Sequence, residues 1–336
     1  MATRGLSRET RDSYISGIRR FLNWQKSNWD KVSSLDHEKR MEAFITSLAT
    51  DKKRPITFGT QNGYFNAVLY FYREFQGKAV ANIKAARASR SQRIFSLLTV
   101  EQIRSLFANL PPYPSNIQLI AKLLYGTGMR IDECLSLRVK DVLFDEGLIA
   151  VQEGKGDKSR FVDLPKSIIA ELKTQLAYAR TQYDMDRALK RNGVALPGGL
   201  ATKYPSYSTT WEWYWLFPHF REGWDKEAEI KRRFHVYVFD AQEAFRVARR
   251  KLKLPETTTP HTLRHCYSTC YLKHLLAETK KSGLEIPDMF GFCRDALKEK
   301  LGHVSPQTVN TYIHLATKRG KMMDCSPLDL MDIKVK

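Results

Sequence analysis

Short motifs rich in arginine, lysine and histidine follow one another along this chain, and they constrain its fold more than any other feature. They are GTGMRIDE at 126–133, EGKGDK at 153–158, HTLRH at 261–265 and LGH at 301–303, followed by Tyr312 nine positions later. Alone, an HxxR pair is usually a solvated helix start, and a GKG sequence is usually a hairpin turn. Their order and spacing together predict a fold in which these distant segments converge on one site.

The residue types in these motifs suit the attack of a tyrosine hydroxyl on a DNA phosphodiester. A phenol has an unperturbed pKa of about 10, so it needs a proton acceptor or nearby cations to act as a nucleophile. The planar forks of Arg130 and Arg264 can hold two non-bridging phosphate oxygens through paired hydrogen bonds. His261 and His303 can share the phosphate charge or move a proton at neutral pH. We therefore predict Tyr312 as the nucleophile and these four side chains as its phosphate ligands.

The ordered motifs resemble the active site of the tyrosine recombinases, the phage integrase family. The resemblance implies a 3′-phosphotyrosyl intermediate, strand exchange through a Holliday junction, and no metal or other cofactor. It also implies that a lysine of the GKG turn protonates the leaving 5′-hydroxyl; the matching position is Lys155, and Lys158 is the rival. Glu133 is expected to orient Arg130 and not to carry a proton. The alternative is a DNA-binding relative that no longer cleaves, but the clamp and nucleophile residues are all present.

The charge balance favours a polyanionic partner such as DNA. Lys and Arg number 55 against 36 Asp and Glu, a net charge of +19 that suits phosphate contacts. A ribosomal or membrane-surface protein could carry the same charge without the motifs above. The five cysteines show no CxxC or metal-ligand spacing, so no metal site is expected. Because the sequence has no apolar run of membrane-spanning length and no hydrophobic signal core after Met1, we expect a cytoplasmic, nucleoid-associated bacterial protein without a membrane partner.

The hydrophobic pattern predicts a mainly α protein with a small β-sheet. Residues 1–82 are expected to form an all-helical DNA-binding domain, similar to the SAM-like core-binding domain of the recombinases. Residues 98–336 are expected to form an α+β catalytic domain, with strands at 148–152 and 160–164 on either side of the Lys155 loop.

Local patterns place several helices. A helix from about Asp36 is expected to bury Met41, Phe44, Ile45 and Leu48, and another begins near Thr60. Thr99 followed by Gln102 predicts a capping box at the start of the catalytic domain.

Cations recur at every third residue in the segment 83–97, which joins the two domains. They are Lys84, Arg87, Arg90 and Arg93, separated mostly by small residues. This pattern favours an extended or loosely helical linker whose side chains contact DNA phosphates. The alternative is a solvated charge run.

Residues 192–220 form an insertion in which glycine and proline exclude long regular structure. It ends in Trp211, Trp213 and Trp215, three of the six tryptophans of the chain. In a strand these alternating residues would share one face. That face is either a buried tryptophan-rich strand under the preceding helix or a surface on which unpaired bases stack.

This insertion resembles the extra region of integron integrases. The similarity is carried by Tyr-Asp at 183–184, Leu-Pro at 196–197, Lys-Tyr-Pro at 203–205, the run from Trp213 to Pro218 and Arg-Arg-x-His at 232–235. It implies that Trp213, Trp211 and His235 contact bases flipped out of a folded single-stranded cassette site. The alternative is a phage or transposon integrase that acts on double-stranded core sites.

Two segments near the C-terminus complete the expectations. Between Arg264 and His303 lie 38 residues, more than in integron integrases, and the extra part at about 278–293 is either a surface loop or a remodelled interface. The apolar tail at about 317–336 is expected to be exchanged between subunits of a homotetramer on DNA, although it could instead fold back on its own domain.

Overall fold

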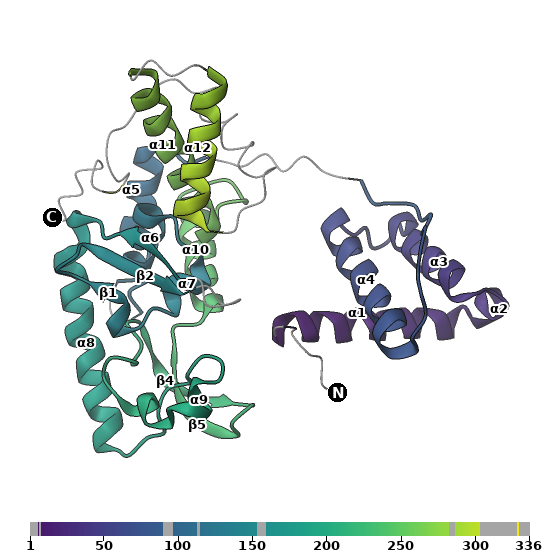
Figure 1. Cartoon of the computed structure of the whole chain (residues 1–336), viewed down its shortest axis with the longest axis horizontal. Coiled ribbons are helices and arrows are strands. Elements are labelled where there is room, and N and C mark those ends of the chain that lie inside the picture. Colours follow the sequence, from purple (N-terminus) through teal and green to yellow (C-terminus); the bar gives the residue numbers. More distant parts are fainter. Residues whose placement is uncertain are drawn as a thin grey trace. The chain divides into compact units, whose positions relative to one another are not determined.

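The computed structural model describes residues 6, 8–89, 97–112, 115–152, 159–281, 286–302 and 328. Contacts divide the chain into two compact units, residues 1–94 and 95–336. The described residues form mostly helices with two small antiparallel sheets, so the predicted fold class is confirmed (Figure 1). Among these residues, none of the helices has the length and apolarity that a membrane crossing requires.

The regular elements described in the first unit are all helices. Its elements are α1 (Arg8–Ser27), α2 (Trp29–Val32), α3 (His37–Thr50), α4 (Phe58–Tyr70) and the π-helical turn η1 (Phe71–Phe75). The predicted helix after Asp36 is confirmed, because the Asp36 carboxylate accepts a hydrogen bond from the Lys39 N–H (2.8 Å) and so caps α3. As predicted, α3 buries Met41, Phe44, Ile45 and Leu48, which pack with Phe21, Val68, Tyr72 and Val80.

The first part of the predicted linker is bound to this helical unit. The Lys84 N–H donates to Glu42 Oε1 (2.6 Å), and the Ala86 N–H donates to Thr46 Oγ1 (3.1 Å), so the segment follows α3. Hydrogen bonds to side chains of a helix satisfy backbone groups that would otherwise need water or a strand partner. The backbone near Lys84 therefore has a fixed course along the helical unit.

The second unit begins with helices and a three-stranded sheet. Its first elements are α5 (Val100–Ala108), α6 (Ile117–Thr127), α7 (Ile131–Leu135), η2 (Val139–Asp141), β1 (Val142–Leu143), β2 (Leu148–Gln152) and β3 (Ser159–Asp163). The predicted capping box is present, with the Thr99 hydroxyl accepting from the Gln102 N–H (3.2 Å) and the Gln102 side chain accepting from the Thr99 N–H (2.9 Å). Both predicted strands are confirmed, the second one residue earlier than expected, in an antiparallel sheet of order β1-β2-β3.

The rest of the second unit is again mostly helical, with one further two-stranded sheet. Its elements are η3 (Lys166–Ile168), α8 (Ile169–Ala188), α9 (Leu200–Lys203), η4 (Pro205–Thr209), β4 (Pro218–Asp225), β5 (Ile230–His235), α10 (Val238–Lys251), α11 (Pro260–Lys281) and α12 (Ile286–Leu301). Helix α6 is buried on nearly every side and packs against α11. The turn after α6 and the start of α11 are therefore held together by the core of this unit.

The tryptophan run does not form the strand that its alternation allowed. The Tyr214 N–H closes a turn on the Trp211 carbonyl (3.0 Å), and of the run only Trp215 pairs in an isolated bridge, with Arg138. The Arg138 guanidinium donates to the carbonyls of Trp213 (2.5 Å) and Ala195 (2.7 Å), and the Leu216 N–H donates to the Leu137 carbonyl (2.9 Å). The run therefore pairs with residues 137–140 without forming a regular strand. Trp215 is buried, as one alternative predicted, and the unpredicted hairpin of β4 and β5 begins only at Pro218.

The extra segment at 278–293 is helical where the structure describes its backbone. It contributes the end of α11 and the first half of α12, with residues 282–285 outside the described part. The two helices pack through a cluster that comprises Tyr267, Leu272, Cys293, Leu297 and Leu301. Of the predicted exchange tail, the structure describes only Leu328, which is fully buried in the core of its own unit.

Candidate active site

A glycine turn places Arg130 at the start of α7. Gly128 is the C-terminal cap residue of α6; it has a left-handed φ of 69° and donates its N–H to the Leu124 carbonyl (3.1 Å). A Cβ atom at this position would lie 2.3 Å from the Tyr267 ring, so both the backbone angle and the space require glycine. Two residues later, Arg130 is the N-terminal cap residue of α7.

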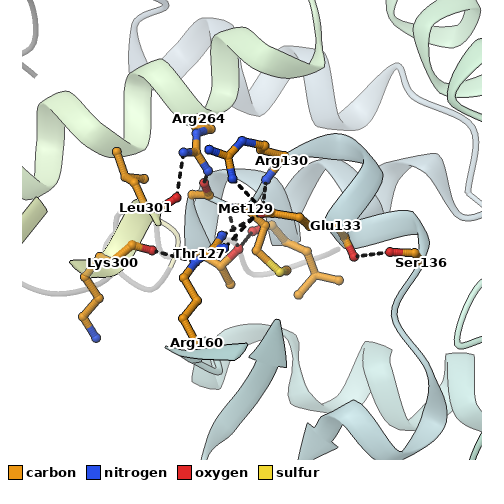
Figure 2. Close-up of polar contacts among 11 residues, drawn as sticks. Thr127, Met129, Arg130, Glu133, Ser136, Arg160, Arg264, Lys300 and Leu301 are labelled. Atoms are coloured by element: carbon orange, nitrogen blue, oxygen red, sulfur yellow. Dashed lines mark hydrogen bonds and ion pairs between the residues drawn. The ribbon is translucent and has the colours of Figure 1, made fainter. Parts of the chain in front are cut away.

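Arg264 is fixed against the same turn. It lies in the first turns of α11, where its Nη1 donates to the Gly128 carbonyl (2.6 Å) and its Nη2 donates to the Leu301 carbonyl (2.9 Å). The residue is 3% exposed, so these carbonyls hold a desolvated guanidinium in one orientation. Figure 2 shows the guanidinium groups of Arg130 and Arg264 beside each other, although the residues are far apart in the sequence.

The Glu133 carboxylate binds both the backbone N–H and the guanidinium of Arg130. This carboxylate accepts from the Arg130 N–H (2.8 Å) and from Arg130 Nη1 (2.6 Å), and it also accepts two bonds from Arg160 (3.1 and 2.6 Å). Burial by itself raises the pKa of Glu133, but the hydrogen bonds from Arg160 and Arg130 outweigh it and lower that pKa to about 2. Glu133 is therefore an ionised ligand of Arg130 and not a proton carrier at neutral pH.

Two histidines lie on the first turns of α11. The rings of His261 and His265 are 4.6 Å apart and nearly perpendicular. Burial, together with the charges of Arg264 and Arg130, lowers the pKa of His261, while burial and the neighbouring His261 and Arg264 lower that of His265 to about 3. His265 is buried, whereas His261 is exposed beside the arginines and is neutral at pH 7. Of these two histidines, His261 is the one whose neutral ring is open to solvent.

The structure thus brings together three of the six predicted catalytic residues, Arg130, Arg264 and His261. The other three, Lys155, His303 and Tyr312, lie outside the described residues. The segments that lead to two of them are described and reach this site. Strands β2 and β3 pair up to Gln152 and Ser159, on either side of the Lys155 loop, and Leu301, which binds Arg264, is two residues before His303.

Arg160 is the described site residue that the motifs did not identify. It lies on β3 with its side chain 10% exposed and binds Glu133 through both terminal nitrogens. A signal for it exists in the sequence, because it is an inward position of a short strand, two residues before the buried Val162. An arginine at such a position needs a buried acceptor, although the sequence does not say which one.

The tryptophans predicted to meet DNA bases are engaged in packing within the unit. Trp213 stacks on Tyr207 (ring centroids 5.8 Å apart), and the Lys140 ammonium lies 4.0 Å from its centroid. Tyr207 stacks in turn on Tyr204 (5.1 Å), which is 41% exposed. Tyr204, Tyr207 and Trp213, called the aromatic stack below, therefore present Tyr204 at their outer end.

The two other predicted base contacts are also partly enclosed. Trp211 lies edge-on against Tyr183 (5.5 Å). His235 lies edge-on against Trp215 (5.0 Å), shares a hydrogen bond with the Val236 carbonyl (2.7 Å), and has its pKa lowered by burial.

The predicted linker cations divide between described and undescribed residues. Lys84 and Arg87 have exposed side chains, with the Arg87 guanidinium 4.5 Å from the centroid of the Phe65 ring. Arg90 and Arg93 lie outside the described part.

Comparisons with known proteins agree in both units. Residues 96–278 match the model of the "Phage integrase family", and residues 1–82 match that of the "Phage integrase, N-terminal SAM-like domain". An "Integrase/recombinase" of Escherichia coli is 33% identical over 330 residues, which cover 97% of this chain and 89% of that protein. Tyrosine recombinase XerA of Thermococcus kodakarensis is 29% identical over 261 residues, covering 75% of this chain and 72% of the relative.

Solved structures show the same fold at lower identity. A lambda integrase dimer bound to a core site has a TM-score of 0.56 at 14% identity, with 96% of this chain and 94% of that chain covered. The Tn1549 transposon integrase in complex with circular intermediate DNA has a TM-score of 0.55 at 16% identity, with coverage of 92% and 91%. The family match over more than half of the chain and the 33% identical relative place this protein in the phage integrase family, the tyrosine recombinases of site-specific DNA recombination.

Proposed function

We propose that this protein cleaves and rejoins DNA at specific sites through a 3′-phosphotyrosyl intermediate. The observation that carries the proposal is the pairing of two guanidinium groups from distant segments, Arg264 held by the Gly128 carbonyl and Arg130 held by Glu133. The Arg130 side chain is 35% exposed, so part of this cationic surface is open to an anion. Two planar donor groups of this kind are suited to the two non-bridging oxygens of a phosphodiester.

The proposed reaction has two balanced steps. The Tyr312 hydroxyl gives its proton to His261 and its oxygen attacks phosphorus in line, the bond from phosphorus to the 5′-oxygen breaks, and Lys155 protonates the leaving 5′-oxygen. Arg130, Arg264, His261 and His303 stabilise the charge, and His261 is neutral at pH 7 and able to accept the phenol proton. In the second step, a 5′-hydroxyl of the partner strand returns a proton to Lys155 and attacks the phosphotyrosine, the bond from phosphorus to the Tyr312 oxygen breaks, and His261 returns the proton to Tyr312. Neither ATP nor a metal is needed for rejoining, because the covalent bond keeps the phosphodiester energy.

A nicked suicide substrate tests the nucleophile. We expect the wild-type protein to accumulate a covalent DNA adduct and Tyr312→Phe to bind the same DNA without forming one. Tyr237→Phe, at an exposed tyrosine after β5, is the matched control and should form the adduct at the wild-type rate. A covalent product from Tyr312→Phe would refute the assignment.

The finer part of the proposal is that the substrate includes folded single-stranded sites. Its support is the aromatic stack, whose inner ring, Trp213, is covered by Tyr207 and Lys140. An unpaired base would therefore stack on Tyr204, displacing the flexible Lys203 ammonium that lies 5.4 Å from its ring centroid, while Trp213 supports the stack from below.

Matched substrates separate this proposal from a duplex-specific phage or transposon integrase. Tyr204→Ala and Trp213→Ala should each weaken binding to a folded hairpin by roughly tenfold, because one base stacked on an aromatic ring contributes about 1–3 kcal/mol. Both should bind a duplex site like the wild type. Phe239→Ala, at an aromatic residue that is 72% exposed on α10, is the control. Equal losses on hairpin and duplex would remove the flipped-base proposal and favour the duplex enzyme.

DNA contacts by the basic segment and assembly into a homotetramer are further parts of the proposal. Lys84 and Arg87 have exposed side chains on a backbone fixed along α3. Replacing each by Ala should therefore reduce the number of counterions released on DNA binding by about one, measured as the slope of log K against log salt concentration.

Exchange of the tail would require Leu328 to leave the core of its own unit. Removal of residues 317–336 should preserve DNA binding by the monomer and abolish assembly on a four-way junction, measured by light scattering.

A further inference from the structure

We infer that Arg160 is a positioning residue for the cleavage step, joining three segments that carry the proposed catalytic groups. These are the turn with Arg130, the strand that follows the Lys155 loop, and the end of α12 before His303. The inference rests on the proposed function, since it concerns the residues that act in it.

The contacts of Arg160 reach all three segments at once. Its Nη1 and Nη2 donate to the two oxygens of Glu133 (3.1 and 2.6 Å), and Glu133 in turn binds Arg130. Its Nε donates to the Lys300 carbonyl (3.2 Å), next to the Leu301 carbonyl that binds Arg264. Figure 2 shows these groups meeting between the strand and the helix end.

The register of the sheet connects Arg160 to the lysine loop. Arg160 pairs with Val151, and the next pair, Ser159 with Gln152, is the last before that loop. A second contact fastens the same strand to α12, because Lys300 Nζ donates to Asp163 Oδ2 (2.6 Å). The loop therefore leaves a strand whose position is set relative to both α7 and α12.

Only arginine can make this set of bonds. Its planar group offers two parallel donors for a carboxylate and a third donor on its other edge, whereas a lysine ammonium is a single point of charge. Loss of Arg160 removes two of the four hydrogen bonds that Glu133 accepts, so Glu133 no longer fixes Arg130 in one orientation. A misplacement of about 1 Å in a reacting group can slow a reaction by about 100-fold.

Single-turnover cleavage of the suicide substrate by Arg160→Met tests the inference. We expect covalent adduct to form about 30- to 100-fold more slowly, with the Kd for DNA within about twofold of the wild-type value. Arg160→Lys should recover part of the rate. Arg180→Met, which removes a half-exposed arginine of α8, is the matched control and should cleave normally.

A double-mutant cycle with Glu133→Gln distinguishes positioning from loss of folded protein. If Arg160 acts through Glu133, the double variant should cleave no more than about threefold slower than the slower single variant. Rates are compared well below each melting temperature. Wild-type cleavage by Arg160→Met, fully multiplicative losses in the double variant, or a rate loss matched by an equal loss of DNA binding would each overturn the inference. A wild-type protein that forms no adduct would instead refute the proposed function itself.

Discussion

Two buried carboxylates in the second unit each gather arginines, and they differ in what remains open. Glu133 binds Arg130 and Arg160 at the site, whereas Asp186, near the end of α8, binds Arg233 (2.6 and 2.9 Å) and Arg191 (2.7 Å). In both networks, one carboxylate accepts several charge-assisted hydrogen bonds from guanidinium groups.

The two networks differ in how far their arginine side chains are exposed to solvent. The Asp186 and Arg233 side chains are 1% and 2% exposed, and the remaining Arg233 nitrogen donates to the His219 carbonyl (2.9 Å). The Arg130 side chain, in contrast, is 35% exposed and lies beside Arg264. The Glu133 carboxylate orients Arg130 without enclosing it, so Arg130 can still bind an anion, whereas the enclosed Arg233 joins β5 to α8 and is structural.

Removal of the enclosed acid should have the largest effect on stability. Asp186→Asn leaves the buried Arg233 without its counter-charge, so we expect a loss of about 3–5 kcal/mol in the free energy of unfolding, measured by urea denaturation. DNA cleavage per folded molecule should be unchanged. A loss below about 1 kcal/mol would show that the Asp186 network is not the structural counterpart of the Glu133 network.

Removal of the open arginine should affect the reaction and not the fold. Arg130→Ala should slow adduct formation by about 100- to 1000-fold, or about 2.7–4 kcal/mol, as for the loss of one donor to a developing charge. Its melting temperature should fall far less than that of Asp186→Asn. Cleavage within tenfold of the wild-type rate would contradict the assignment of this surface to phosphate binding.

The pH dependence of stability should identify Glu133 as an ionised partner. The hydrogen bonds that hold its pKa at about 2, below the ordinary 4.5, contribute stability that is fully present above about pH 4.5 and is lost as the pH falls through about 2. Glu133→Gln should therefore shrink the difference in unfolding free energy between pH 7 and pH 3 by about 2 kcal/mol. Urea denaturation at both pH values measures it, and an unchanged difference would contradict the lowered pKa.

Loss of an exposed ion pair should have the smallest effect on the free energy of unfolding. Arg180 and Asp184 pair on α8 at 3.0 Å with both side chains more than half exposed. Asp184→Ala should change the free energy of unfolding by less than about 0.5 kcal/mol, because solvent screens such pairs. A loss as large as that of Asp186→Asn would mean that burial does not separate the two kinds of pair.

Local features of the chain were predictable because their partners are near in sequence. The cap at Asp36 and the capping box at Thr99 each need only the next three residues, and the strands beside the Lys155 loop are adjacent along the chain. The insertion was not predictable in the same way. The alternation of Trp211, Trp213 and Trp215 allowed a strand, but Arg138, distant in sequence, binds their backbone in another conformation.

The sequence by itself determined the family and the residue types of the site, because the motifs are short and follow one another in a fixed order. It also determined that a helical region precedes a mixed region of helices and strands, because hydrophobic periodicity is local. Only the tertiary structure decided that Arg160 supports Glu133 and that the Gly128 and Leu301 carbonyls fix Arg264. The physical reason is that a buried guanidinium needs acceptors, and many carbonyls and acids along a chain can serve. Which of them reach it is set by the packing of α6 against α11 and of α12 against β3.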